Sequence, residues 1–157
     1  MPQSSPASDS VFGLRVEKLR AAMRDQGQQA VVIEPGAAMM YLTGVRWGRS
    51  ERTFAVIVPL RGRLVFVVPA FEESRARELI GSGADIRVWQ EDDSPFQLIA
   101  ELVSGAGAAK GRVGMDPNMR FFVFDGVRNA LQGAEFGSAE QVFKTAGVES
   151  SGRGSGR

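Results

Sequence analysis

The sequence predicts an α/β domain in which a mixed β-sheet carries helices on both faces, a three-layer arrangement. Two observations lead to this prediction. Segments with helical spacing of apolar residues alternate along most of the chain with short β-rich runs. Two of these runs follow one another directly and predict a hairpin within the alternation. Strands joined by a helix are expected to be parallel, whereas the hairpin is antiparallel, so the sheet is mixed.

The first elements are a helix and a buried strand. Phe12, Val16, Leu19 and Met23 recur at helical spacing, and the helix is expected to end near Gly27. The run 30–33 is short, apolar and mostly β-branched, and Pro35-Gly36 follows it. It predicts a buried strand that leads into a turn.

An apolar stretch, the hairpin and a helix come next. The stretch 39–44 ends in glycine and is interpreted as core rather than as a cofactor site. The runs 54–59 and 64–69 are expected to pair as the hairpin, with Gly62 in the turn. Their continuous apolar character indicates burial on both faces. The segment 71–80 has a helical pattern that ends at a glycine.

The second half of the chain repeats the order of strand and helix. The expected strands are 85–89, 112–115 and 134–136. Each is followed by residues typical of a helix N-terminus, a Ser or Asp cap with proline or with a capping box. These starts are Ser94-Pro95, Asp116-Pro117 with a helix through Leu131, and Ser138-Ala-Glu-Gln141.

Length and composition predict one folded domain over 11–146, between a disordered leader at 1–10 and a disordered Gly/Arg/Ser tail at 147–157. The chain has 157 residues, and 43% of them are hydrophobic. The leader lacks the basic start and apolar core of a signal peptide, and no apolar run reaches the roughly 20 residues of a membrane span. We therefore expect a soluble, cytoplasmic protein.

Two missing residue types exclude much enzyme chemistry. The chain contains no histidine and no cysteine, which excludes Ser-His-Asp and Cys-His nucleophiles, zinc fingers, disulfides and His-ligated metals. We assign no catalytic residue, no metal ligand and no cofactor to this chain. Nineteen basic and eighteen acidic residues leave a net charge of +1, which argues against a nucleic-acid or membrane partner.

Two motifs are explained better by a structural role at a helix end than by a binding function. The glycines at 81–83 and 105–107 begin like phosphate-binding loops, but they end helices and lack the third glycine. The acids Glu91-Asp92-Asp93 could bind a hard cation. Their position directly before Ser94 fits better with a favourable interaction with the helix N-terminus.

The loop 45–52 holds the candidate binding residues, Arg46, Trp47 and Arg49. Arginine recognises carboxylates and phosphates, and tryptophan offers an aromatic wall, so this loop could bind an anionic or peptide ligand. A solvated or interface loop explains the same residues equally well. Both alternatives stay open at this point.

The order of these signals resembles the N-terminal domain of creatinase, prolidase and aminopeptidase P. The resemblance rests on Arg15-Val-Glu-Lys-Leu19, Tyr41-Leu-Thr-Gly44, Leu64-Val-Phe-Val-Val-Pro69, Trp89 at a strand end, and Arg112-Val-Gly-Met-Asp116. It covers about residues 13–144. It implies a ribonuclease-H-like α/β domain that precedes a pita-bread catalytic domain. The whole protein would then be an Xaa-Pro aminopeptidase or dipeptidase.

The resemblance also implies what this chain lacks. In the family, two divalent metal ions of the Mn, Co or Zn type are held by Asp, Asp, His, Glu and Glu of the catalytic domain, none of which carries over. The chain would then serve oligomerisation and substrate gating and would be inactive alone. Its expected partner is a second copy of itself, in a homodimer, or a catalytic domain. Arg46, Trp47 and Arg49 would lie near a neighbouring subunit's substrate entrance. The tail predicts a truncated or frameshifted gene. The alternative is a free-standing module that binds an anionic or peptide ligand.

Overall fold

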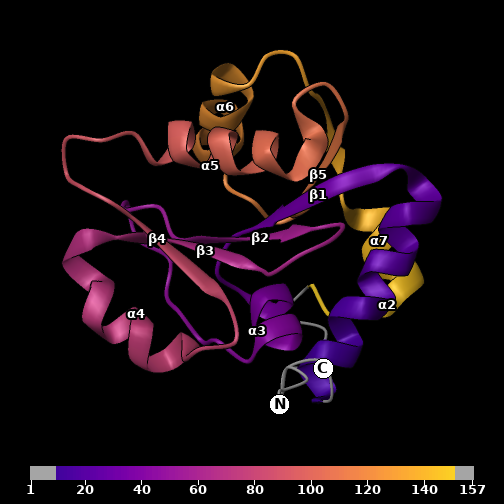
Figure 1. The fold of residues 1–157 in the computed structure, drawn as a ribbon, viewed down its shortest axis with the longest axis horizontal. Coiled ribbons are helices and arrows are strands. Elements are labelled where there is room, and N and C mark those ends of the chain that lie inside the picture. Colours follow the sequence, from indigo (N-terminus) through magenta and orange to yellow (C-terminus); the bar gives the residue numbers. More distant parts are fainter. Residues whose placement is uncertain (1–9, 151–157) are drawn as a thin grey trace.

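The computed structural model describes residues 10–150 and contains one six-stranded mixed sheet with the order β4-β3-β2-β1-β5-β6 (Figure 1). The strands are β1 (Gln28–Ile33), β2 (Ala55–Pro59), β3 (Val65–Pro69), β4 (Asp85–Trp89), β5 (Arg112–Met115) and β6 (Glu135–Ser138). The α-helices are α2 (Val11–Gln26), α3 (Ala37–Thr43), α4 (Glu73–Ile80), α5 (Pro95–Val103), α6 (Phe121–Ala130) and α7 (Glu140–Ala146). A 3₁₀ turn, η1 (Ala70–Glu72), precedes α4, and a π-helical segment, η2 (Ser104–Ala108), follows α5.

Strand direction gathers most strand ends at one edge of the sheet. β2 pairs antiparallel with both β1 and β3, whereas β4 is parallel to β3, and β5 and β6 continue parallel to β1. Five strands therefore run in one direction and β2 runs in the other. We call the edge where those five strands end and β2 begins the carboxyl edge. It comprises the segments 34–36, 44–54, 70–71, 90–92 and 116–120 and residue 139 after β6.

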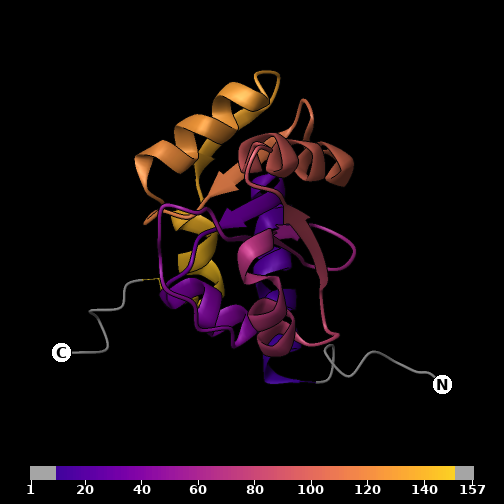
Figure 2. The same cartoon turned by 90° about the vertical axis from the view of Figure 1, so that its left-hand side faces the viewer.

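The sheet is covered on both faces, which confirms the predicted three-layer α/β architecture. Side chains of β1 alternate: Val31 and Ile33 pack into a cluster with α2, α3, α4 and α7, whereas Ala30 and Val32 pack into a second cluster with α5 and α6. Figure 2, which faces the carboxyl edge, shows α5 and α6 above the sheet and α3 and α4 below it. β2 is buried along its whole length, as its apolar run predicts.

One helix start forms as the sequence predicts, at Ser94-Pro95, and α2 has a cap at Ser10 that the sequence analysis assigned to the leader. The Ser10 hydroxyl accepts a hydrogen bond of 3.0 Å from the Gly13 amide and caps α2, and Gly27 ends this helix with a φ of 73°. The Ser94 hydroxyl accepts from the Gln97 amide at 3.2 Å, and Pro95 is the first residue of α5. The cap at Ser94 depends on contacts within three residues, and the sequence predicted it, whereas Ser10 was expected to be part of the disordered leader.

Two other predicted helix starts are wrong. Asp116-Pro117 does not begin a helix, because α6 starts only at Phe121. The Asp116 carboxylate accepts hydrogen bonds from the amides of Asn118 and Glu34, and its carbonyl closes a turn with Met119. Ser138 belongs to β6, and its hydroxyl accepts from the Glu140 amide in a short turn, so α7 starts at Glu140.

The remaining predictions concern the apolar stretch and the chain ends. The stretch 39–44 forms most of α3, with Met39 and Leu42 buried in the core. Apart from Ser10, the expected leader lies outside the described residues, as do residues 151–157 of the expected tail. Within that expected tail, Val148 is buried in the core. Among residues 10–150, no helix is both long and apolar enough to cross a bilayer.

Candidate functional site

Two acidic side chains are buried where the neighbouring parallel strands β1 and β5 end. Glu34 directly follows β1 and is 0% exposed, and Asp116 directly follows β5 and is 5% exposed. Burying a carboxylate is costly unless cations or hydrogen-bond donors surround it. Their partners therefore decide what this part of the carboxyl edge does.

Glu34 is held by two arginines from different segments. Arg120 donates from Nε at 3.1 Å and from Nη2 at 2.6 Å to Glu34 Oε2, and its backbone amide donates to Oε1 at 2.8 Å. Arg49 Nη1 lies 3.7 Å from Glu34 Oε1. A planar guanidinium that donates two bonds at once fixes geometry better than an ammonium would. Glu34 thus joins the loop 44–54 to the start of α6.

Asp116 binds the backbone rather than a cation. Its Oδ2 accepts from the Glu34 amide at 3.2 Å, and its Oδ1 accepts from the Asn118 amide at 2.9 Å. Burial raises the pKa of the Asp116 carboxyl, although the two amides and the charge of Arg49 oppose this rise. Asp116 therefore connects the ends of β1 and β5 and closes the turn toward Arg120.

The structure places the three predicted binding residues in different environments. Arg46 is exposed, and among the described residues it has no hydrogen bond or ion pair. Trp47 is half-buried and stacks on Phe54 with ring centroids 4.2 Å apart, and the Arg75 guanidinium lies 4.4 Å from its ring centroid. In addition to its contact with Glu34, Arg49 donates from Nε to the Pro35 carbonyl at 2.8 Å. Only Arg46 is therefore free to meet a ligand without losing a contact.

The far end of the loop crosses toward β3 and β4. Arg52 Nε donates to Glu91 at 2.7 Å, and its guanidinium lies 5.4 Å from the ring centroid of the exposed Phe71. Trp89 donates from Nε1 to the Thr53 carbonyl at 3.0 Å. The loop is thus held at its middle by Glu34 through Arg49 and near its far end by Glu91 through Arg52, whereas Arg46 in its first half has no such contact.

The acids at 91–93 have structural partners, but these are not the N-terminus of α5 that the sequence led us to expect. Glu91 pairs with Arg52, and the Asp93 carboxylate accepts from the Gln90 amide at 3.1 Å. Within residues 10–150, no group of three or more acidic side chains is placed to hold a metal ion. The arrangement at this edge can orient the loop 44–54 and leave the Arg46 guanidinium exposed.

Sequence reasoning missed Glu34, Asp116 and Arg120 as members of one site. A signal for two of them was present, because Ile33-Glu34-Pro35 and Met115-Asp116-Pro117 both place an acid and a proline directly after a buried strand. Parallel neighbours bring such residues together at the same edge. Nothing local marks Arg120, which reaches Glu34 across 86 residues of sequence.

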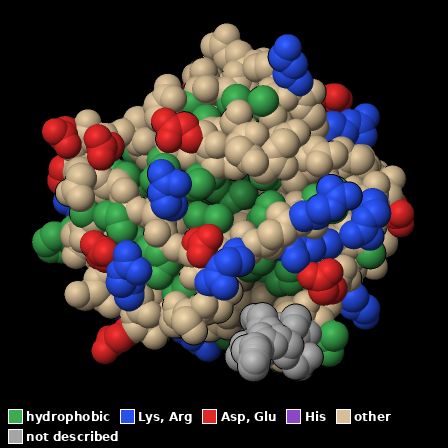
Figure 3. Space-filling model, viewed as in Figure 1, with side chains coloured by type: hydrophobic (Ala, Val, Ile, Leu, Met, Phe, Trp, Pro, Cys, Tyr) green, Lys and Arg blue, Asp and Glu red, His purple; other side chains and the backbone are tan. Residues whose placement is uncertain are grey.

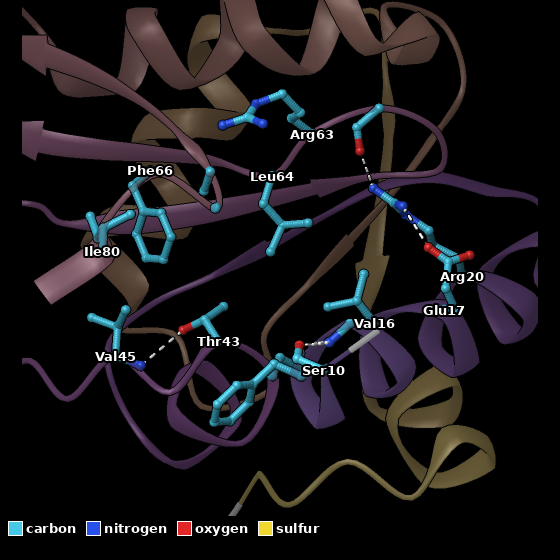
Figure 4. A pocket seen from close by; sticks show the side chains of 16 residues that line it. Ser10, Val16, Glu17, Arg20, Thr43, Val45, Arg63, Leu64, Phe66 and Ile80 are labelled. Atoms are coloured by element: carbon cyan, nitrogen blue, oxygen red, sulfur yellow. Dashed lines mark hydrogen bonds and ion pairs between the residues drawn. The ribbon is translucent and has the colours of Figure 1, made fainter. Parts of the chain in front are cut away.

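A separate pocket of about 410 Å³ lies between the start of α2, the tip of the β2–β3 hairpin and the turn before β4 (Figure 4). Its walls are mostly apolar and include Val16, Leu64 and Phe66. The charged groups at its rim already have partners: Arg20 donates to Glu17 and to the Pro59 carbonyl, and Arg63 to Asp85. On the face of the molecule that is seen in Figure 1, Figure 3 shows apolar side chains in the middle, below α5.

Comparisons with known proteins agree on one family. The sequence pattern of the Creatinase/Prolidase N-terminal domain matches residues 15–146. An uncharacterized peptidase of Schizosaccharomyces pombe is 32% identical over 133 residues, which are 76% of this chain and 28% of that protein. The probable dipeptidase PepE of Mycobacterium tuberculosis is 31% identical over 101 residues, which are 63% of this chain and 27% of that protein.

Solved structures match the fold. The dipeptidase PepE of Mycobacterium ulcerans superposes with a TM-score of 0.75 and 28% identity, covering 85% of this chain and 36% of that one. The Creatinase/Prolidase N-terminal domain of an X-Pro dipeptidase from Streptococcus pyogenes gives a TM-score of 0.69 at 16% identity, covering 83% of this chain and 97% of that one. This chain thus spans about a third of the PepE structure and nearly all of the isolated domain.

Proposed function

This chain belongs to the creatinase/prolidase N-terminal domain family, and from that membership we propose that it acts as the non-catalytic domain of an Xaa-Pro-specific metallopeptidase. The single observation that carries the proposal is the match over residues 15–146 to a domain that forms only part of longer peptidases. The chemistry of peptide cleavage would reside in a catalytic domain with two divalent metal ions, in cis or in trans. This chain supplies neither histidine nor an acidic cluster among its described residues for such a centre.

The role that we propose for this domain is to gate substrate access and to support dimer formation, in the cytoplasm. The structure supports gating through the loop 44–54. Glu34 holds the middle of the loop through Arg49, Glu91 holds its far end through Arg52, and Trp47 packs on Phe54. Arg46 has no partner among the described residues. A fixed loop loses little conformational entropy when a ligand binds, and a free guanidinium suits the carboxylate of a short peptide.

Activity measurements test the non-catalytic role directly. The purified chain should release no proline from an Xaa-Pro dipeptide, with or without Mn²⁺ or Co²⁺. The positive control is a full-length dipeptidase of the family under the same conditions. Metal-dependent turnover that copurifies with the chain and responds to substitutions in it would overturn the proposal.

Titration of the isolated chain with Xaa-Pro dipeptides distinguishes gating from a free-standing binding module. Gating in concert with a catalytic domain predicts that Arg46 contacts a peptide only while that domain holds the rest of the peptide, so this chain alone should show no saturable binding. Saturable binding that Arg46→Ala abolishes would instead favour the module. Arg61→Ala is the matched control, because Arg61 is also an exposed arginine and lies at the tip of the hairpin, away from the carboxyl edge.

A further inference from the structure

Four aromatic side chains lie between the start of α6 and β6, of which two are exposed and two, Phe124 and Phe136, are partly buried. Phe121 is 71% exposed and Phe122 is 45% exposed. The Phe121 ring contacts Phe124 at a centroid distance of 6.4 Å, and Phe124 contacts Phe136 at 6.3 Å. We call Phe121, Phe122, Phe124 and Phe136 the aromatic face. Exposed aromatic residues that lie side by side mark interaction surfaces more often than scattered apolar residues do.

A hollow lies next to the aromatic face. It has a volume of about 470 Å³ and lies between α6 and β6. Phe124 and Phe136 provide its apolar wall, and Arg128 and Gln132 lie at its rim. A partner can therefore insert side chains into the hollow while it receives the ring of Phe121.

The buried acid network holds the aromatic face in place. The Arg120 guanidinium lies 4.8 Å from the ring centroid of Phe122 and binds Glu34 at the same time. Phe122 also meets Phe96 edge to face, at a centroid distance of 6.4 Å. Because these contacts exist before any partner binds, docking would order few additional side chains.

The described chain ends next to this face. The Asn118 side-chain amide donates to the carbonyl of Ser150, the last described residue. Val148, two residues earlier, is buried, and its amide donates to the Phe143 carbonyl at 2.9 Å. Polypeptide that extends beyond Ser150 in a longer protein would therefore start close to Phe121 and Phe122.

We propose that the aromatic face is the docking surface for the peptidase portion that accompanies this domain in its longer relatives. That portion would present an apolar socket for Phe121 with carboxylates around it. Charge favours this partner, because the side chains of Arg120, which contacts Phe122, and of Arg49, which shares Glu34 with it, remain 29% and 30% exposed. This inference rests on the proposed function, because it assumes a peptidase portion.

A chimera tests the inference. Residues 10–150 replace the matching N-terminal stretch of the Mycobacterium ulcerans dipeptidase, and amide hydrogen exchange is compared between the chimera and the isolated chain. We expect exchange over 119–126 to slow on the order of 10-fold or more in the chimera. Unchanged exchange there, or a chimera that does not fold although the isolated chain does, would overturn the inference.

Single substitutions separate docking from the stability of the domain. Phe121→Ser should leave the melting temperature of the isolated chain unchanged within about 2 °C, because its ring is exposed. The same substitution should remove the slowed exchange in the chimera. Phe71→Ser is the matched control, since Phe71 is also exposed but lies beside Arg52, and it should leave the slowed exchange intact. Equal effects of both substitutions would contradict the assignment.

Activity of the chimera distinguishes the two proposals. Slow exchange over 119–126 without hydrolysis of an Xaa-Pro dipeptide would support the docking surface and count against the proposed function. Hydrolysis without slowed exchange would leave the proposed function standing and overturn the docking surface. The two failures are therefore seen in different measurements.

Discussion

A buried carboxylate is tolerated only where neighbouring groups compensate its charge, and three groups do so for Glu34. The Arg120 side chain, the Arg120 amide and Arg49 all face it, so the negative charge is compensated on each accessible side. Such a group contributes little net stability compared with an apolar residue of the same size. Its main effect is specificity, because the loop 44–54 and the start of α6 must both be in place to satisfy it.

Removal of the Glu34 charge should therefore destabilise the fold. We expect Glu34→Gln to lower the free energy of unfolding by about 2–3 kcal/mol, because a neutral amide replaces an acceptor of charge-assisted hydrogen bonds. The measurement is urea denaturation followed by circular dichroism. Glu17→Gln is the control: its ion pair with Arg20 is exposed at the Glu17 side chain, and its loss should lower stability by less than about 1 kcal/mol. Equal losses in both variants would contradict this account.

Asp116 should make stability depend on pH in a defined direction. Burial raises the pKa of its carboxyl in the folded state, so between the unfolded and folded pKa values the folded state binds more protons. The contribution of Asp116 to the free energy of unfolding therefore falls as pH rises from about 4 and becomes constant above its raised pKa.

Comparison with Asp116→Asn isolates this contribution. The variant should be less stable, because its amide nitrogen cannot accept from the Glu34 backbone. The stability difference between wild type and variant should shrink as pH rises through the window. Urea denaturation at several pH values between about 4 and 7 measures this difference. A difference that grows with pH would show that the pKa is lowered instead.

At the scale of elements, the two helices above the sheet meet at a glycine. A Cβ atom at Gly126 of α6 would lie 2.5 Å from ring atoms of Phe96 at the start of α5. These atoms include Cγ, which is fixed close to the α5 backbone, so the ring cannot move away cheaply. Gly126 therefore sets how closely α5 and α6 pack, and with it the position of Phe122.

Gly126→Ala should destabilise the fold although alanine favours helices. Overpacking costs about 1–3 kcal/mol, and the better helix propensity returns at most about 1 kcal/mol. Thermal unfolding should show a lower melting temperature for this variant. Gly105→Ala, where a Cβ would meet nothing within 4 Å, should change stability by less than about 0.5 kcal/mol. A stabilised Gly126→Ala would show that the two helices separate freely.

At the scale of the whole molecule, both helical layers share one sheet, so the described residues should unfold as a unit. Trp89 is buried against the second core cluster, and Trp47 packs on Phe54 of the first. In a Trp47→Phe variant, the fluorescence of Trp89 should therefore report the same urea midpoint as far-UV circular dichroism. Two separate midpoints would mean that the layers unfold independently.

The candidate site was only partly accessible to prediction. Arg46, Trp47 and Arg49 were found because one short loop contains all three. The role of Arg49 as a partner of Glu34 could not be found in this way, because the two residues meet only through the turn after β1. Asp116 was misassigned as a helix cap, since its sequence context fits a cap and the competing Glu34 amide is 82 residues away.

The sequence by itself determined the identity of most elements, the hairpin, the cap of α5, and the family. These features depend on periodicity and on contacts within a few residues, which a linear reading contains. Only the tertiary structure decided which strand ends meet, which acids are buried, and that α6 begins beside the end of the described chain. Those outcomes depend on strand order, because pairing β1 with β5 brings together residues that the sequence keeps far apart.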